Sequence, residues 1–159
     1  MEDIDRQILT LLSQDGRMSF THLGKATGLS TSAVHQRVRR LEKRGVICGY
    51  TAVINPDAAG LPLTAFVSVT PLDPAAPDDV PELLAPLPEI EACYSVAGAE
   101  NYILKVRVAT PGTLEGLLAR IRAAAGVSTR TTIVLSTPYE ARPLLTAAPT
   151  TPTADADAG

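Results

Sequence analysis

The sequence has little of several residue types that mark particular classes of protein. Its 159 residues include no tryptophan, only 4% aromatics, two histidines and two cysteines. A disulfide framework needs several cysteines, and a zinc site needs clustered His and Cys ligands at short spacings. We therefore predict two free thiols, no metal and no cofactor.

Long apolar runs are also missing from the chain. No stretch reaches the 18 or so apolar residues of a membrane-spanning helix, so no membrane partner is expected. The first residues, MEDIDRQILTLL, are acidic and amphipathic, and they lack the basic leader and cleavage site of a signal peptide. The expected location is the cytoplasm.

The net charge of −3 conceals an uneven distribution of charged residues. Residues 1 to 50 contain 8 Lys and Arg against 5 Asp and Glu, whereas the remaining residues contain 6 against 12. A basic segment joined to an acidic one suggests that only the first part of the chain meets a polyanion.

That basic part has the pattern of three short helices. Amphipathic spacing predicts a first helix over residues 4–14, with Asp3 or Asp5 as its N-cap. A second helix over residues 19–27 has Leu23 and Ala26 as its apolar face. The turn Gly28-Leu29-Ser30 then leads into a third helix over residues 31–44, which Gly45 ends.

The third helix combines an apolar stripe with many cations. Val34, Val38 and Leu41 recur at helical spacing and should face the other two helices. Together with the helix before it, the third helix has the layout of a helix-turn-helix. In that motif the later helix, here the third of the chain, enters the DNA major groove. Polar side chains near its start would read bases, and arginines and lysines would neutralise phosphates. The predicted DNA-binding residues are Thr31, Ser32, His35, Gln36, Arg37, Arg39, Arg40 and Lys43.

The rest of the chain alternates strand and helix patterns. VICGYTAVIN, residues 46–55, is expected to be a strand that links two domains. Strand patterns follow at residues 63–70, 89–97, 101–109 and 127–136, with helices near residues 78–86 and 114–121 between them. The order is that of a ferredoxin-like βαββαβ domain. A tail rich in Ala, Thr, Pro and Asp should be disordered.

Both halves of the chain resemble the Lrp/AsnC family of regulators. LGKATGLSTSAVHQRVRRLEKRGVI resembles the family's helix-turn-helix, and GYTAVINP resembles its hinge strand. CYSVAGAENYILKVRV and TRTTIVLS resemble the core and the closing strand of its effector domain. The resemblance implies an α+β fold with a winged-helix-like domain over residues 1–46, a hinge over 47–62, a ferredoxin-like domain over 63–143 and a tail over 144–159.

The resemblance also implies partners and an effector site. Family members form homodimers that assemble into octamers, bind double-stranded DNA, and hold an amino acid between dimers. The matching residues here are the loop Gly98, Ala99, Glu100, Asn101 and Tyr102, together with Thr129 and Thr131. Ala99 and Asn101 stand where the family usually has acidic residues. Three possibilities therefore stay open: an amino acid or related small molecule as in the family, a different ligand, or a site that binds none.

Three functions are consistent with the sequence. The first is a sequence-specific transcriptional regulator modulated by a small molecule, and the second is an architectural nucleoid-type protein that needs no ligand. The third is an enzyme like the tetrapyrrole decarboxylases that share this fold. Because His22 and His35 both lie in the first domain and no catalytic set is present in the second, we predict that the protein is not an enzyme.

Overall fold

The computed structural model describes residues 1–145, and these fall into two compact units. Met1–Ala52 forms the first unit together with residues 139–145, and Val53–Pro138 forms the second. Most of the predicted tail lies outside the described residues. The domain boundaries at 46, 62 and 143 are finer than this division and stay a prediction.

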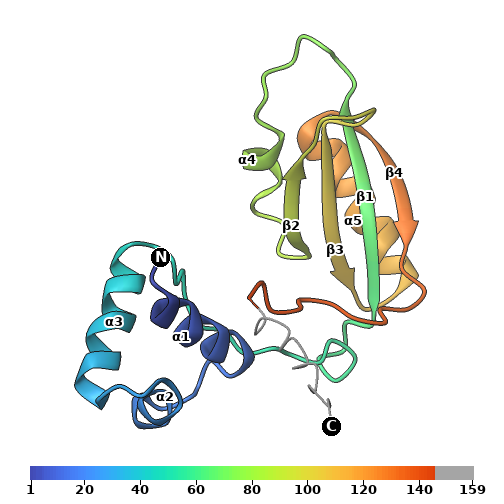
Figure 1. Ribbon diagram of the computed structural model, residues 1–159. Coiled ribbons are helices and arrows are strands. Elements are labelled where there is room, and N and C mark those ends of the chain that lie inside the picture. Colours follow the sequence, from blue (N-terminus) through green and yellow to red (C-terminus); the bar gives the residue numbers. More distant parts are fainter. Residues whose placement is uncertain (146–159) are drawn as a thin grey trace, which may run out of the picture. The chain divides into compact units, whose positions relative to one another are not determined.

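The first unit is a bundle of three helices, labelled in Figure 1. They are α1 (Asp3–Gln14), α2 (Phe20–Thr27) and α3 (Thr31–Lys43). Their common core contains four fully buried apolar side chains, and half-buried apolar residues pack around it. The four are Ile8, Leu23, Val34 and Val38.

Local capping explains where two of these helices begin and end. The hydroxyl of Ser19 accepts a hydrogen bond from the amide of His22, and that of Ser30 accepts one from Ala33. Gly28 closes α2 in the left-handed region at φ 72°, as predicted. The prediction of Asp3 or Asp5 as the cap of α1 is wrong, because Glu2 is the N-cap and makes no side-chain cap bond.

The turn between α2 and α3 depends on a glycine that the sequence pattern did not single out. Gly24 is buried, and its carbonyl accepts a hydrogen bond from the amide of Leu29. A Cβ at Gly24 would lie 2.6 Å from the Leu29 carbonyl oxygen, which is too close for any side chain. Ala26, predicted to be part of the apolar face, is exposed instead.

Residues 46–55, predicted to be a strand, form no strand in this chain. Tyr50, Val53 and Ile54 are all exposed. The residue types favour extended backbone, but a strand also needs a neighbour to accept and donate its ladder hydrogen bonds. The described chain provides none for this segment, so the prediction of a strand linker is wrong for the single chain.

The second unit is a four-stranded antiparallel sheet with two helices, as predicted for a ferredoxin-like domain. Along the chain the elements are β1 (Leu63–Pro71), α4 (Val80–Leu84), β2 (Ile90–Ser95), β3 (Tyr102–Val108), α5 (Pro111–Ala125) and β4 (Val127–Ile133). The spatial order is β2-β3-β1-β4, so the first and third strands lie in the centre. The fold class is therefore α+β, with a helix-turn-helix unit and a ferredoxin-like unit.

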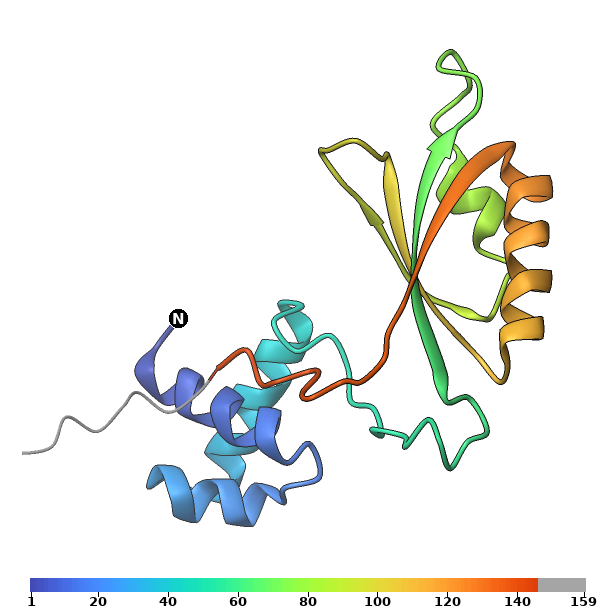
Figure 2. The same ribbon diagram turned by 90° about the vertical axis from the view of Figure 1, so that its right-hand side faces the viewer.

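The two faces of this sheet differ in what covers them. Figure 2 shows α4 and α5 on the same side of the sheet. Side chains on that side are buried and apolar, among them Val67, Leu104 and Val106. Phe66 and Ser68 alternate with them and point to the opposite face, which no helix of residues 53–138 covers.

We predict that Gly24→Ala destabilises the first unit by about 1–3 kcal/mol, because its methyl group would meet backbone rather than a flexible side chain. Urea unfolding followed by far-ultraviolet circular dichroism measures this change. Gly116→Ala in α5 is the control, since a Cβ there meets nothing within 4 Å and should stabilise the helix. Equal stability of Gly24→Ala and the unmodified chain would contradict the role of Gly24.

Candidate nucleic-acid interface and effector pocket

One face of α3 is a continuous row of exposed polar and cationic side chains. The apolar stripe Val34, Val38 and Leu41 is fully buried, which fixes the rotation of the helix about its axis. The opposite face, at the same helical spacing, is exposed along its whole length. It consists of Ser32, Gln36, Arg39 and Lys43.

No side chain of the described residues engages the cations of this row. Within residues 1–145, neither Arg39 nor Lys43 has an ion-pair or hydrogen-bond partner. Their charges are therefore available for phosphate groups, and Gln36 between them presents an amide that donates and accepts hydrogen bonds.

Arg37 and Arg40 lie on the side of α3 that meets α1, and both are paired. Arg37 Nη1 is 2.7 Å from Glu2 Oε2 and 2.8 Å from Asp5 Oδ1. Arg40 Nη2 is 3.1 Å from Asp5 Oδ2 and 3.5 Å from Glu2 Oε1. The sequence predicted free phosphate-binding cations here, whereas the structure gives both arginines carboxylate partners on α1.

Asp5 is the centre of this cluster. Its side chain is 1% exposed, and burial by itself would raise its pKa. The hydrogen bond from Arg37 and the charges of Arg40 and Arg37 outweigh burial, so that the pKa of Asp5 is lowered. Asp5 is therefore a buried carboxylate that stays charged because two guanidinium groups surround it.

The two remaining predicted DNA-binding residues differ in their surroundings. Thr31 is exposed at the start of α3. His35 is half-buried, and its ring packs edge-on against Phe20 of α2, with the ring centroids 5.2 Å apart. His35 therefore connects α2 to α3 as well as lying near the exposed row.

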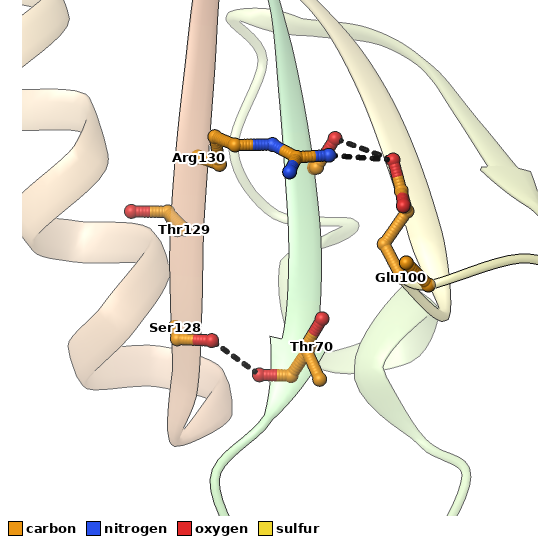
Figure 3. Close-up of a pocket in the computed structure, with 7 residues that line it drawn as sticks. Thr70, Glu100, Ser128, Thr129 and Arg130 are labelled. Carbon is orange, nitrogen blue, oxygen red and sulfur yellow. Dashed lines mark hydrogen bonds and ion pairs between the residues drawn. The ribbon is translucent and has the colours of Figure 1, made fainter.

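The second unit has an open hollow of about 150 Å³ on the uncovered face of its sheet. Its lining comes from β1, from the loop between β2 and β3, and from β4, as the close-up in Figure 3 shows. The lining residues are Ser68, Thr70, Ala99, Glu100, Ser128, Thr129 and Arg130.

An anion and a cation face each other across this hollow. Glu100 accepts a hydrogen bond of 2.9 Å from the hydroxyl of Ser68, and Arg130 Nη2 lies 3.4 Å from Glu100 Oε1. The Ser68 hydrogen bond and the nearby charge of Arg130 keep the pKa of Glu100 below its usual range. The side chain of Arg130 is 75% exposed, so its guanidinium is open to a second anionic partner.

The structure brings part of the predicted effector loop to this hollow. Ala99 and Glu100 line it, whereas Gly98 and Asn101 are exposed beside it and do not. Tyr102 is buried on the helix-covered face, where its hydroxyl donates to Asp78, and this hydrogen bond raises the pKa of Tyr102 to about 12.

The two predicted threonines of β4 share a strand face, but it is the face toward α5. Thr129 accepts a hydrogen bond from Arg122 of that helix and contributes to the hollow only at its edge. In Figure 3 its side chain points away from Arg130. Thr131 is not among the lining residues.

Sequence reasoning missed Arg130 and Ser128, which do face the hollow. Because side chains alternate along a strand, these two residues lie on the opposite face of β4 from Thr129. Register would have identified them, since Arg130 pairs with Ser68 in the ladder between β1 and β4. That pairing depends on the sheet order, which the strand patterns alone do not give.

The described residues contain neither a metal-binding cluster nor a membrane-spanning helix. No group of three or more His, Cys, Asp or Glu side chains within residues 1–145 is placed to hold a metal ion. None of the helices described is long and apolar enough to cross a membrane.

Both units match models of known protein families. Residues 1–42 match the AsnC-type helix-turn-helix domain, and residues 64–144 match the Lrp/AsnC ligand binding domain. The two matches lie in the order in which the two units follow one another along the chain.

Curated relatives and solved structures agree with these matches. The transcriptional regulator LrpA of Mycobacterium tuberculosis is 55% identical over 142 residues, which cover 89% of this chain and 95% of the relative. The leucine-responsive regulatory protein of Escherichia coli is 39% identical over 140 residues, 85% of each chain. A feast or famine regulatory protein of M. tuberculosis, solved with L-methionine, has a TM-score of 0.89 at 54% identity and covers 91% of this chain and 98% of its own.

LrpA is named as a transcriptional regulator and the other two relatives as regulatory proteins, and none of the three is named as an enzyme. The enzyme considered from the sequence is therefore not supported. The relatives' coverage of the chain, together with the two domain matches, shows that this protein belongs to the Lrp/AsnC family and is a ligand-modulated, DNA-binding transcriptional regulator.

Proposed function

We propose that α3 lies in the major groove of double-stranded DNA with the row Ser32, Gln36, Arg39 and Lys43 facing the bases and phosphates. The observation that carries this proposal is the burial of the apolar stripe on the opposite side, which leaves the row exposed. Gln36 can make two hydrogen bonds to adenine, and Arg39 and Lys43 have the charge to bind phosphates.

We also propose that the hollow beside Glu100 is the effector site, and that its ligand is an amino acid. Glu100 would accept hydrogen bonds from an ammonium group, and Arg130 would pair with a carboxylate. The relative solved with L-methionine supports this class of ligand. The hydroxyls of Ser68 and Ser128 line the same space and would orient the ligand.

A third proposal concerns assembly into homodimers and, from these, octamers. Phe66 lies in the middle of β1 and is 39% exposed on the sheet face that no helix covers. Lys105 and Arg107 on the same face already pair with Glu91. Because both cations already have a carboxylate partner within the chain, a second copy can cover the face without leaving them unpaired.

For the DNA interface, we predict that replacing both Arg39 and Lys43 by Gln weakens binding to every duplex. Loss of two phosphate contacts should reduce the slope of log K against log salt concentration by about 1.8. Gel shifts over a range of salt concentrations measure this slope, and Arg122→Gln on α5 is the control. An unchanged slope in the double variant would overturn the proposed interface.

Gln36→Ala should relax the preference at one base pair, by about 1–3 kcal/mol of discrimination. Selection of bound duplexes from a random library, carried out with both proteins, measures this preference. If the unmodified protein enriches no sequence at all, the protein binds DNA as an architectural protein and the sequence-specific reading is wrong.

For the effector, we expect one or more amino acids, with L-methionine and L-leucine tested first, to raise the melting temperature of the protein. A ligand at a hundred times its dissociation constant adds about 2.7 kcal/mol to the free energy of unfolding. Arg130→Gln should abolish this shift, whereas Thr131→Val, on the other face of β4, should retain it. A shift that survives Arg130→Gln would place the ligand elsewhere.

For the assembly, we expect Phe66→Lys to lower the mass seen by sedimentation velocity, because it introduces a charge at the centre of the proposed interface. Leu83→Lys is the matched control, since Leu83 is exposed to a similar extent but lies on α4, on the opposite side of the sheet. A mass that is the same for both variants and the unmodified chain would contradict dimerisation through this face.

A further inference from the structure

The cations of α3 form two groups with different surroundings. Arg39 and Lys43 belong to the exposed row and have no partner within residues 1–145. Arg37 and Arg40 lie one step around the helix, toward α1, and face two carboxylates there. The sequence presents all four as equivalent, and the tertiary structure separates them.

The carboxylates engage Arg37 more completely than Arg40. Both contacts of Arg37 are shorter than 3 Å, and its side chain is only 25% exposed. The shortest contact of Arg40 is 3.1 Å, and its side chain is 46% exposed. Two carboxylates against two guanidinium groups make this cluster, Glu2, Asp5, Arg37 and Arg40, electrically neutral.

The neutral cluster borders the proposed groove-facing row and is not remote from it. An open hollow on this side of α3 is lined by Ala33, Gln36, Arg37 and Arg40, so it touches the amide that we propose to read bases. Without their carboxylate partners, these two arginines would be unpaired cations at the edge of the proposed interface.

We infer that Asp5, with Glu2, is a positioning residue that holds Arg37 and Arg40 against α1, so that the phosphate contacts of α3 fall on Arg39 and Lys43. The inference rests on the proposed DNA interface. A paired arginine must lose carboxylate bonds to bind a phosphate, and a phosphate that it does not bind keeps its condensed counterion. By keeping two arginines away from phosphates, the cluster limits the part of the affinity for DNA that does not depend on base sequence.

The salt dependence of DNA binding distinguishes a positioning role of Asp5 from a purely structural one, because its slope reports the number of phosphate contacts. On a duplex selected by the unmodified protein, Arg39→Gln should lower the slope of log K against log salt concentration by about 0.9. The double variant Asp5→Asn with Arg37→Gln should leave the slope unchanged. Changing both partners avoids leaving the buried carboxylate of Asp5 without its cation.

The converse variant releases the arginines. Glu2→Gln removes the exposed carboxylate, which forms no cap bond, so the fold should be retained. Its slope should steepen by up to about 0.9 for each arginine that gains a phosphate contact, which corresponds to about a threefold greater loss of affinity between 50 and 200 mM salt. Circular dichroism melts confirm that each variant is folded.

The outcomes distinguish this inference from the interface on which it rests. If the Asp5→Asn, Arg37→Gln double variant lowers the slope as much as Arg39→Gln does, Arg37 contacts phosphate and the inference is wrong, while the interface stands. An unchanged slope in Glu2→Gln also counts against it. If Arg39→Gln leaves the slope unchanged, the proposed interface itself fails.

Discussion

The rotation of α3 about its own axis is the constraint on which the DNA-binding surface depends. Val34, Val38 and Leu41 are buried against the other two helices, and a helix with three buried positions at this spacing has only one orientation. Turning it by one residue would bury Arg37 or Arg39 at the cost of desolvating a charged group. The same apolar contacts that stabilise the bundle therefore expose the row that we propose to enter the groove.

In the second unit, the alternation of side chains along each strand places the core residues and the proposed binding residues on opposite faces of the sheet. Its strands alternate, so that apolar side chains such as Leu104 pack under α4 and α5, while Lys105, Arg107 and Phe66 face the other way. Glu100 and Arg130 then meet on the uncovered face, where a small molecule or a second copy has access. In both units, packing on one side of an element decides which chemistry is presented on the other.

Long helices and strands followed closely from sequence patterns, because their signals are local. Ser19 and Ser30 cap the predicted helices, and Gly28 has the predicted left-handed conformation. The predictions that failed concerned residues whose structure depends on a contact partner far away in the sequence. Residues 46–55 have the composition of a strand but find no ladder partner in the described chain, and Asp5 pairs with α3 where a cap for its own helix was expected.

The sequence by itself determined the order of elements, the family and the identity of the basic helix, since each depends on residue types at short, regular spacings. Only the tertiary structure decided which of the cations are free. Arg37 meets Glu2 across 35 residues of chain, and Arg130 meets Glu100 across 30. Such contacts depend on how helices pack and on the register between strands. Neither property can be inferred from the local pattern of side chains.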